Sequence, residues 1–272
     1  MESEDVDLDL NGIFPEPDRP PTPETTVCTY VRAVERLKEE KEGEGWKEVE
    51  VRLVGTHTLW GHYLWNAARA FATYLDREEN VELYKGKNVL ELGAGAGLPG
   101  LVMAINGARR TVLTDYPDEA LLDNLTHNVA RNISASKRKR VGAEVFVEGY
   151  IWGRPVDRLL ELVAPEKYDL VILSDLVFNH SQHDALLKTC ELTLRTDTDT
   201  RQPGIAVPTV LVFYTHHRPH LASRDLEFFS KARERGWVCK EVVTERYPPM
   251  FPDDPGDEDV RATVHGWSLT RR

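Results

Sequence analysis

Cysteine is scarce in this 272-residue chain, and its few copies lie far apart. The three cysteines are Cys28, Cys190 and Cys239. They form no Cys-x-x-Cys motif, which argues against a disulfide framework and against a structural zinc site. Two histidine pairs, at positions 180 and 183 and at 216 and 217, come without a third ligand at metal-binding spacing. We therefore expect no bound metal.

Long apolar runs and an excess of positive charge are also missing. No run of apolar residues is long enough for a transmembrane helix, and the N-terminus begins acidic rather than with the basic and apolar regions of a secretory signal. The formal net charge is -11, from 34 Lys and Arg against 45 Asp and Glu. Proteins that bind nucleic acid by neutralising phosphates usually carry the opposite balance. We expect a cytoplasmic protein that binds neither membrane nor nucleic acid.

The acidic residues are concentrated at the N-terminus. Residues 1–26 hold eight acids, one base and five prolines, a composition typical of a disordered or extended segment. We expect this tail to precede a single domain over residues 27–272, with residues 27–86 as its lead-in. A strongly negative tail is expected to attract a cationic partner.

Short apolar segments alternate with amphipathic ones from residue 87 onward. Predicted strands cover 87–92, 111–115, 143–149, 168–175, 209–215, 237–245 and 260–269, and predicted helices cover 96–108, 118–132, 156–164, 181–194 and 225–236. This alternation implies parallel pairing and a doubly wound, Rossmann-like α/β sheet of seven strands. No helix separates the last two strands, so we expect the final one to enter antiparallel. The lead-in predicts a strand at 49–55 and an amphipathic helix in the second half of 56–78.

The segment VLELGAGAGLPG places a glycine-rich loop after a buried strand, where ligands bind in such folds. It can be divided in two ways. Gly95-x-Gly97-x-x-Gly100 is formally a dinucleotide fingerprint, but it puts a proline inside the turn and gives Glu91 and Gly93 no role. The division Glu91-x-Gly93-x-Gly95-x-Gly97 uses every residue and makes Glu91 a candidate contact for the cofactor. An acid there is compatible with a ligand that has no phosphate, whereas it would repel a pyrophosphate.

Polar residues follow two other predicted strands. Asp115 ends the strand after the glycine loop, at a position where an acid accepts hydrogen bonds from ribose hydroxyls; the alternative is an N-cap for the following helix. A ribose contact indicates an adenosine-containing ligand, and it is compatible with both divisions of the glycine-rich loop. Asp175 and Asn179, in SDLVFNH, are candidates to hold and orient a substrate amine. A helix cap or a salt bridge is the alternative for Asp175.

Aromatic residues accompany these loops. Trp60, Trp65 and Trp152 are candidates for cation–π contact with a sulfonium or ammonium group, and core packing is the alternative for each. The loop RYPPMFPDDPGDEDV, at 246–260, combines aromatic residues with five acids. Such a surface suits a basic peptide, although a plain solvated loop is the alternative.

The strings LWGHYLWNAA, NVLELGAGAGLPG, TDYPD, NLTHN, YIWG and SDLVFNH together resemble one family. They resemble the class I, seven-strand S-adenosylmethionine-dependent protein methyltransferases related to nicotinamide N-methyltransferase, over residues 49–269. The resemblance implies a sheet in the order 3-2-1-4-5-7-6, with strand 7 antiparallel. It implies S-adenosylmethionine as methyl donor, with cofactor contacts at Gly93, Ala94, Gly95, Asp115, Trp152 and Ser174 and at either Trp60 or Trp65. Many relatives carry a tyrosine where this chain has Phe178, which lacks a hydroxyl.

Within that family, the chain is similar to the fungal enzymes that act on translation elongation factor 1-alpha. The resemblance implies methylation of the N-terminal glycine amine and the adjacent lysine in the basic N-terminal segment of that factor. We expect a monomer in which Asp175, His180 or a water molecule assists deprotonation of the acceptor. Another protein lysine or a small-molecule amine is an alternative acceptor, because the fold does not fix it. The alternatives from other classes are an NAD-dependent oxidoreductase and a non-catalytic adaptor.

Overall fold

The computed structural model describes residues 24–34, 36, 45–55, 61–133, 143–196 and 207–271. Residues 1–23 of the predicted tail lie outside the described residues, and so does Trp60. No helix in these ranges is long and apolar enough to cross a membrane.

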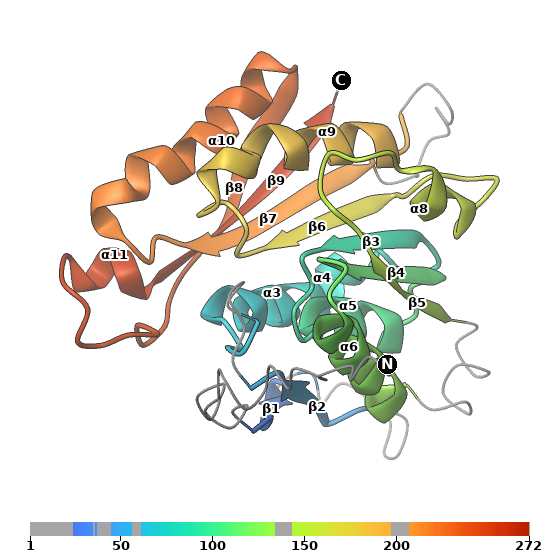
Figure 1. The fold of residues 1–272 in the computed structure, drawn as a ribbon, viewed down its shortest axis with the longest axis horizontal. Helices are drawn as coiled ribbons and strands as arrows, with labels where there is room; N and C mark the ends of the chain where they lie inside the picture. The colour runs from blue at the N-terminus through green and yellow to red at the C-terminus, as the bar shows by residue number, and fades with distance from the viewer. Residues whose placement is uncertain are drawn as a thin grey trace, which may run out of the picture.

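A seven-stranded sheet forms the centre of the fold (Figure 1). Its strands are β3 (Asn88–Leu92), β4 (Arg110–Asp115), β5 (Glu144–Gly149), β6 (Leu170–Ser174), β7 (Thr209–Thr215), β8 (Trp237–Arg246) and β9 (Thr263–Arg271). They lie in the order β5-β4-β3-β6-β7-β9-β8. All pairings are parallel except those of β9, which runs antiparallel to both of its neighbours. The predicted order 3-2-1-4-5-7-6 and the antiparallel last strand are confirmed.

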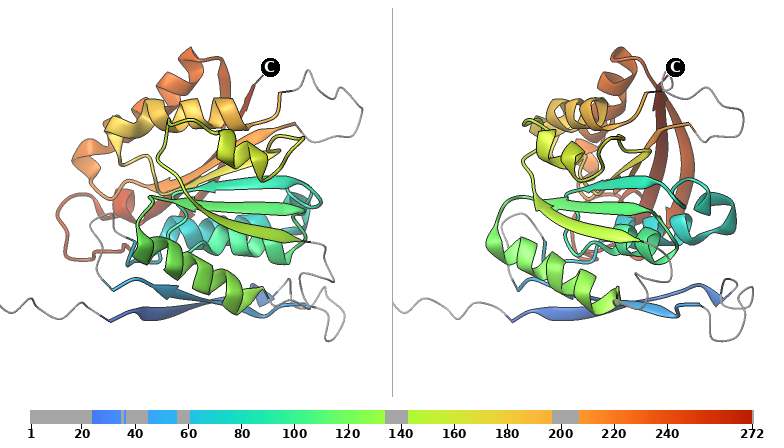
Figure 2. Two further views of the ribbon diagram at one scale, coloured as in Figure 1. Left: turned by 45° about the vertical axis from the view of Figure 1, so that its right-hand side comes forward. Right: turned by 90° about the vertical axis from the view of Figure 1, so that its right-hand side faces the viewer.

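Helices cover both faces of the sheet, so the doubly wound arrangement is confirmed (Figures 1 and 2). One face carries α3 (Asn66–Asp76), α4 (Glu78–Val81), α5 (Leu98–Ile105) and α6 (Glu119–Asn132), and the other carries α8 (Asp157–Glu161), α9 (His183–Thr193) and α10 (Ala222–Glu234). The central strands are therefore apolar on both sides. Every residue of β3 and of β7 is buried, as expected for strands between two helical layers.

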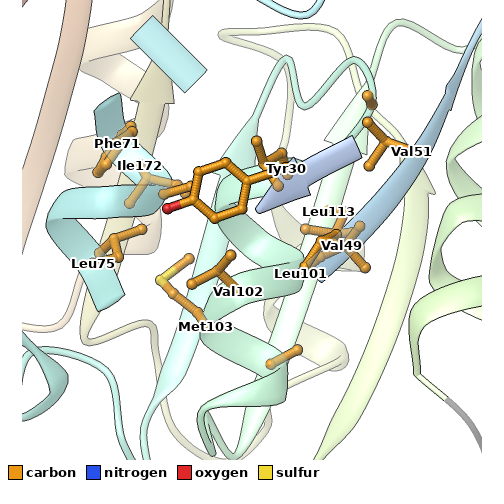
Figure 3. Packing of buried hydrophobic residues seen from close by; sticks show 14 of the residues in the cluster. Tyr30, Val49, Val51, Phe71, Leu75, Leu101, Val102, Met103, Leu113 and Ile172 are labelled. Atoms are coloured by element: carbon orange, nitrogen blue, oxygen red, sulfur yellow. The ribbon is translucent and has the colours of Figure 1, made fainter. Parts of the chain in front are cut away.

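The lead-in forms an antiparallel hairpin of β1 (Thr26–Val31) and β2 (Glu48–Leu53), which lies below α6 in Figure 2. The strand predicted at 49–55 is confirmed, whereas β1 was not predicted. Figure 3 shows apolar side chains of the hairpin packed against α3 and α5; the labelled ones are Tyr30, Val49, Val51, Phe71, Leu75, Leu101, Val102, Met103, Leu113 and Ile172. The hairpin thus shares a hydrophobic core with the sheet.

Three asparagines of α6 attach the helix to the free edge of β2. Asn124, Asn128 and Asn132 are spaced four residues apart, so they lie on one face of the helix. Asn128 accepts from the Arg52 N–H at 2.8 Å and donates to the Arg52 carbonyl at 2.8 Å. Asn132 makes the same pair of bonds to Glu50, at 3.1 and 2.7 Å. Asn128 also donates to the carbonyl of Ala96, at 3.1 Å, which links the hairpin to the glycine loop.

The last predicted strand begins later than expected. The stretch 260–269 was predicted as a strand, but α11 (Glu258–Ala262) occupies its first residues. Asp257 caps this helix by accepting from the N–H groups of Asp259, at 2.9 Å, and Val260, at 3.4 Å. A capping carboxylate stabilises the first helical turn, and here it outweighs the alternating apolar pattern.

Candidate active site

A cavity of about 550 Å³ opens at the carboxyl ends of β3, β4 and β6. The carboxyl ends of parallel strands meet at one edge of a sheet, so loops distant in sequence converge there. Its wall includes most of the residues predicted as site residues: Trp65, Gly93, Ala94, Gly95, Asp115, Trp152, Ser174, Asp175 and Asn179. Glu91 is absent from this wall, and Trp60 lies outside the described residues.

The glycine loop brings bare backbone to the cavity. Gly93, Gly95 and Gly97 have φ angles of 60°, 55° and 77°, in the left-handed region that glycine adopts without penalty. A Cβ atom at Gly93 would lie 2.7 Å from Leu176 and 3.0 Å from Trp152. A Cβ at Gly95 would meet nothing within 4 Å. The backbone at Gly95 therefore faces open space in which a ligand can lie close to it.

Glu91 lies beneath the loop rather than in the cavity. Its side chain is fully buried on β3, and its Oε2 accepts a hydrogen bond from the Gly100 N–H at 2.9 Å. Its Oε1 has no partner among the described residues. Burial raises the pKa of this carboxyl to about 8, despite the opposing hydrogen bond from Gly100. The prediction of a direct cofactor contact at Glu91 is therefore replaced by a different role: this carboxyl holds the start of α5.

This contact also separates the two divisions of the glycine motif. In a dinucleotide site, the N–H groups at the start of the helix bind the pyrophosphate. Here the Gly100 N–H is already bound by Glu91. Gly100 is needed for packing instead, since a Cβ there would lie 2.2 Å from Leu113 and 2.4 Å from Glu91. The geometry favours the division that begins at Glu91.

Because the raised pKa keeps Glu91 protonated in the folded protein up to about pH 8, we expect the free energy of unfolding to depend on pH. The unfolded chain releases this proton near the ordinary glutamate pKa, so the stabilisation is present below that value and is lost as the pH rises through about 8. We expect the free energy of unfolding of Glu91→Gln to fall less steeply between about pH 5 and pH 8, by up to about 1.4 kcal/mol per pH unit. Urea denaturation across this range measures the difference. Exposed Glu234→Gln serves as the control, and parallel curves for Glu91→Gln and the unmodified protein would contradict the prediction.

Asp115 connects the loop to the end of β4. Its Oδ2 accepts from the Gly95 N–H at 2.6 Å, and its Oδ1 accepts from the Tyr116 N–H at 2.7 Å. A carboxylate has about four lone-pair positions, so it can still accept from hydroxyls of a ligand in the cavity. The alternative N-cap role is wrong, because Asp118 caps α6.

Aromatic rings from three segments meet beside the cavity. The Trp65 ring lies 4.7 Å from that of His217 and 6.1 Å from that of Phe251, measured between centroids. The Tyr63 ring stands edge-on to Phe251 at 5.4 Å. Phe251 belongs to the loop predicted as an aromatic wall, so that loop is brought next to the cavity. Of the two tryptophan candidates in the lead-in, Trp65 lies in the wall of the cavity.

Asp175 directly follows β6 and has an unusual conformation for a residue with a side chain. Its φ is 58°, in the left-handed region, and its side chain is 5% exposed. Its Oδ2 lies 2.8 Å from Nε2 of His217, and its Oδ1 accepts from the Thr215 N–H at 3.3 Å. Asp175 thus pairs with a histidine, which is the kind of contact that the salt-bridge alternative proposed, and it lines the cavity as well.

Two neighbouring predictions have different outcomes in the structure. Asn179 lines the cavity, and its Oδ1 accepts from the Ser181 hydroxyl at 3.0 Å. His180, a candidate proton acceptor, is absent from the cavity wall and contacts Asp225 at 2.7 Å. Its imidazole is held by a buried carboxylate, so His180 is not placed to deprotonate a substrate.

Several residues at this site were not singled out from the sequence. Tyr63, Gln182 and Arg218 line the cavity, and His217 lies behind Asp175. They come from loops whose course depends on the tertiary fold, and no local spacing marks them. The only available signal was the His216-His217 pair, which was considered as a metal motif. Within the described ranges, no group of three or more His, Cys, Asp or Glu is arranged to hold a metal ion.

Known proteins share both this sequence and this architecture. The lysine methyltransferase family matches residues 54–235. The chain is 45% identical, over 280 residues, to the protein N-terminal and lysine N-methyltransferase EFM7 of Cryptococcus neoformans, covering 100% of this chain and 91% of the relative. It is 40% identical, over 271 residues, to the protein of that name from Schizosaccharomyces pombe, covering 98% and 97%.

A solved structure shows the same fold at low identity. A putative SAM-dependent methyltransferase from Streptococcus mutans aligns with a TM-score of 0.50 and 14% identity, over 81% of this chain and 53% of that one. The match of the family to residues 54–235, together with 40–45% identity over nearly whole chains, establishes that this protein belongs to the lysine methyltransferase family.

Proposed function

We propose that this enzyme transfers methyl groups from S-adenosylmethionine to the N-terminal glycine amine and the adjacent lysine of translation elongation factor 1-alpha. The observation that carries the proposal is the cavity, which joins the glycine loop and Asp115 to Asp175 and an aromatic wall. The names of the relatives from Cryptococcus neoformans and Schizosaccharomyces pombe support an N-terminal and lysine acceptor.

The residues around the cavity fit S-adenosylmethionine. When bound, this cofactor supplies a methyl group on a positively charged sulfur. Asp115 would accept from the ribose hydroxyls, and the backbone at Gly93 to Gly95 would lie along the methionine portion. Trp65 and Trp152 offer aromatic rings, which attract cations. The open space at the Cβ position of Gly95 is the observation that shows room for such a ligand.

Residues that follow β6 supply the groups that would hold and orient the acceptor amine. Methyl transfer is an in-line displacement, which chiefly requires alignment of an uncharged nucleophile. A protonated amine can be held by the Asp175 carboxylate, and the Asn179 amide offers a second hydrogen-bonding group; both line the cavity. The amine must lose a proton before attack. Phe178 has no hydroxyl to assist, which leaves the Asp175 carboxylate as the nearby acceptor.

The loop at 246–260 provides a surface for a basic peptide beside the aromatic wall. Of its five acids, Glu258 and Asp259 pair with Arg246, and Asp257 caps α11. Asp253 and Asp254 make no ion pair among the described residues, and both are exposed. These two carboxylates are the ones available to a cationic substrate.

We also propose that residues 27–272 act as one domain and that the enzyme is a cytoplasmic monomer. The shared core of the hairpin, α3 and α5 supports the single domain. The tail at 1–26 is proposed to attract the basic segment of the substrate.

Mass spectrometry of elongation factor 1-alpha tests the proposed function. The factor is purified from cells that lack this enzyme and is incubated with the enzyme and S-adenosylmethionine. We expect new methyl groups on the N-terminal amine and on the adjacent lysine. The controls are a factor with an acetylated N-terminus and a factor with arginine in place of that lysine, each of which should lose methylation only at the altered site.

Other outcomes would identify an alternative. Binding of S-adenosylmethionine without methylation of this factor would contradict the substrate and favour another protein lysine or a small-molecule amine. A protein that binds NAD but does not bind S-adenosylmethionine would favour the oxidoreductase.

A further inference from the structure

Asp175 directly follows β6 and is hydrogen-bonded to residues of the neighbouring strand β7 and of the segment after it. The two strands pair in parallel up to Ser174 and Phe213. Beyond that point, the Asp175 N–H donates to the Phe213 carbonyl at 2.7 Å. The Thr215 N–H and His217 Nε2 then contact the two carboxylate oxygens, at 3.3 and 2.8 Å. Both oxygens are therefore held by the end of β7, one by its last residue, Thr215, and the other by His217 just beyond it.

This contact compensates for an unfavourable backbone. Asp175 has a φ of 58°, in the left-handed region that few residues with a side chain adopt. Because an ionised carboxylate only accepts hydrogen bonds, Nε2 of His217 must carry the proton that is shared with it. The His217 bond is shorter than the Thr215 bond, so it is the main restraint on the direction of the carboxylate.

His217 itself does not line the cavity. It borders a small recess with Pro249, Met250, Phe251, Asp254 and Arg261. One face of its ring lies against Trp65, at 4.7 Å between centroids, and Trp65 does line the cavity. His217 can therefore influence a bound acceptor only through Asp175 and Trp65.

We propose that His217 is a positioning residue for methyl transfer, which fixes the Asp175 carboxylate toward the acceptor and sets the net charge of the pair by its own protonation. The proposal rests on the proposed function only in that the acceptor is an amine. With His217 neutral, the pair carries a charge of −1 and attracts an ammonium group. With His217 protonated, the pair is neutral and this attraction is lost.

Charged groups from several elements face His217. Asp175 follows β6, Asp225 belongs to α10, Arg218 is the next residue along the chain, and Asp254 and Arg261 border the recess. Asp225 is also bound by two other histidines, since it contacts Nδ1 of His216 at 2.6 Å and Nε2 of His180 at 2.7 Å. The carboxylate in direct contact with His217 is therefore Asp175.

The direction of the pH effect follows from these charges. Burial lowers the pKa of His217, but the charge and hydrogen bond of Asp175, with the charge of Asp225, outweigh burial, so the pKa is raised. Methyl transfer should therefore decline as the pH falls through the raised pKa, because the pair then becomes neutral.

Replacing His217 with alanine and with glutamine tests the proposal. The glutamine amide retains a donor near the position of Nε2 but does not titrate. We expect His217→Ala to lower kcat/KM by roughly 30-fold or more, because it removes a hydrogen bond to a charged group. Glutamine should recover at least about tenfold of this loss and should remove the component of the acidic limb that follows the titration of His217, leaving the component that follows deprotonation of the acceptor amine. Affinity for S-adenosylmethionine should stay within about twofold, since His217 does not line the cavity.

His265→Gln is the matched control, because His265 also pairs with a carboxylate, Glu241, at 2.9 Å. It should keep the acidic limb. Equal activities of the alanine and glutamine variants, or an acidic limb in His217→Gln identical to that of the unmodified enzyme, would overturn the proposal.

A second measurement is independent of the acceptor. Nuclear magnetic resonance titration of the histidine rings should show that Asp175→Asn lowers the pKa of His217, and an unchanged pKa would overturn the coupling. If the proposed function is wrong, the unmodified enzyme will show no methyl transfer to the proposed acceptor. The titration will still show whether His217 and Asp175 are coupled, so the two failures can be told apart.

Discussion

Replacement of Asp115 with alanine is expected to abolish measurable methyl transfer and to weaken binding of S-adenosylmethionine by at least about 100-fold. The side chain would accept from ribose hydroxyls, and each such hydrogen bond to a charged group is worth roughly 1.5–3 kcal/mol. The same carboxylate holds the loop, since it accepts from the Gly95 N–H at 2.6 Å. Alanine therefore removes contacts to the ligand and the restraint on the backbone that surrounds it.

Isothermal titration calorimetry with S-adenosylmethionine measures this loss. Asp118→Asn is the matched control: it changes a carboxylate three residues away, and asparagine caps a helix about as well as aspartate does. Its affinity should equal that of the unmodified enzyme. Near-normal affinity of Asp115→Ala would show that the ribose assignment is wrong.

Replacement of Gly100 with alanine is expected to destabilise the fold by about 3 kcal/mol, which corresponds to a melting temperature roughly 6–12 °C lower. The added Cβ would lie 2.2 Å from Leu113 and 2.4 Å from Glu91. Both neighbours are fully buried, so neither has free space to move into. Displacement of Glu91 would also break its hydrogen bond to the Gly100 N–H. Differential scanning calorimetry measures the change.

Gly236→Ala separates packing from backbone strain. Gly236 has a φ of 84°, and nothing lies within 4 Å of its Cβ position. We expect a cost of about 1 kcal/mol there, from backbone strain alone. If Gly100→Ala lowers the stability of the fold no more than Gly236→Ala does, the start of α5 adjusts to the extra atom.

The central sheet is predictable because its signals are local. Each of the first five core strands is a short apolar run followed by a turn and a helix, and the order came with the resemblance. β1 was missed because its pattern is weak: of its six residues only Tyr30 is buried. At α11, the capping side chain of Asp257 determined the structure, whereas the prediction relied on apolar alternation.

In the candidate site, too, some contacts follow from local sequence signals and others depend on the tertiary fold. Asp115 and the glycines stand at the ends of two consecutive strands, β4 and β3, so their juxtaposition follows from strand order. His217 and Asp175 are 42 residues apart in sequence, and their contact depends on how the chain turns after β6 and β7. Glu91 illustrates a different difficulty. Its place in the motif was recognised, but the direction of its side chain, toward the start of α5 and away from the cavity, follows from the packing of that helix.

The asparagines of α6 have a consequence for how copies of this protein meet in solution. An exposed strand edge is a template for pairing with another chain. Arg52 and Glu50 present their N–H and carbonyl groups away from β1, and side-chain amides of α6 bind all four of them. At Glu50 and Arg52 the hairpin therefore offers no unpaired backbone to a second molecule, and these amides protect this part of the edge against edge-to-edge aggregation.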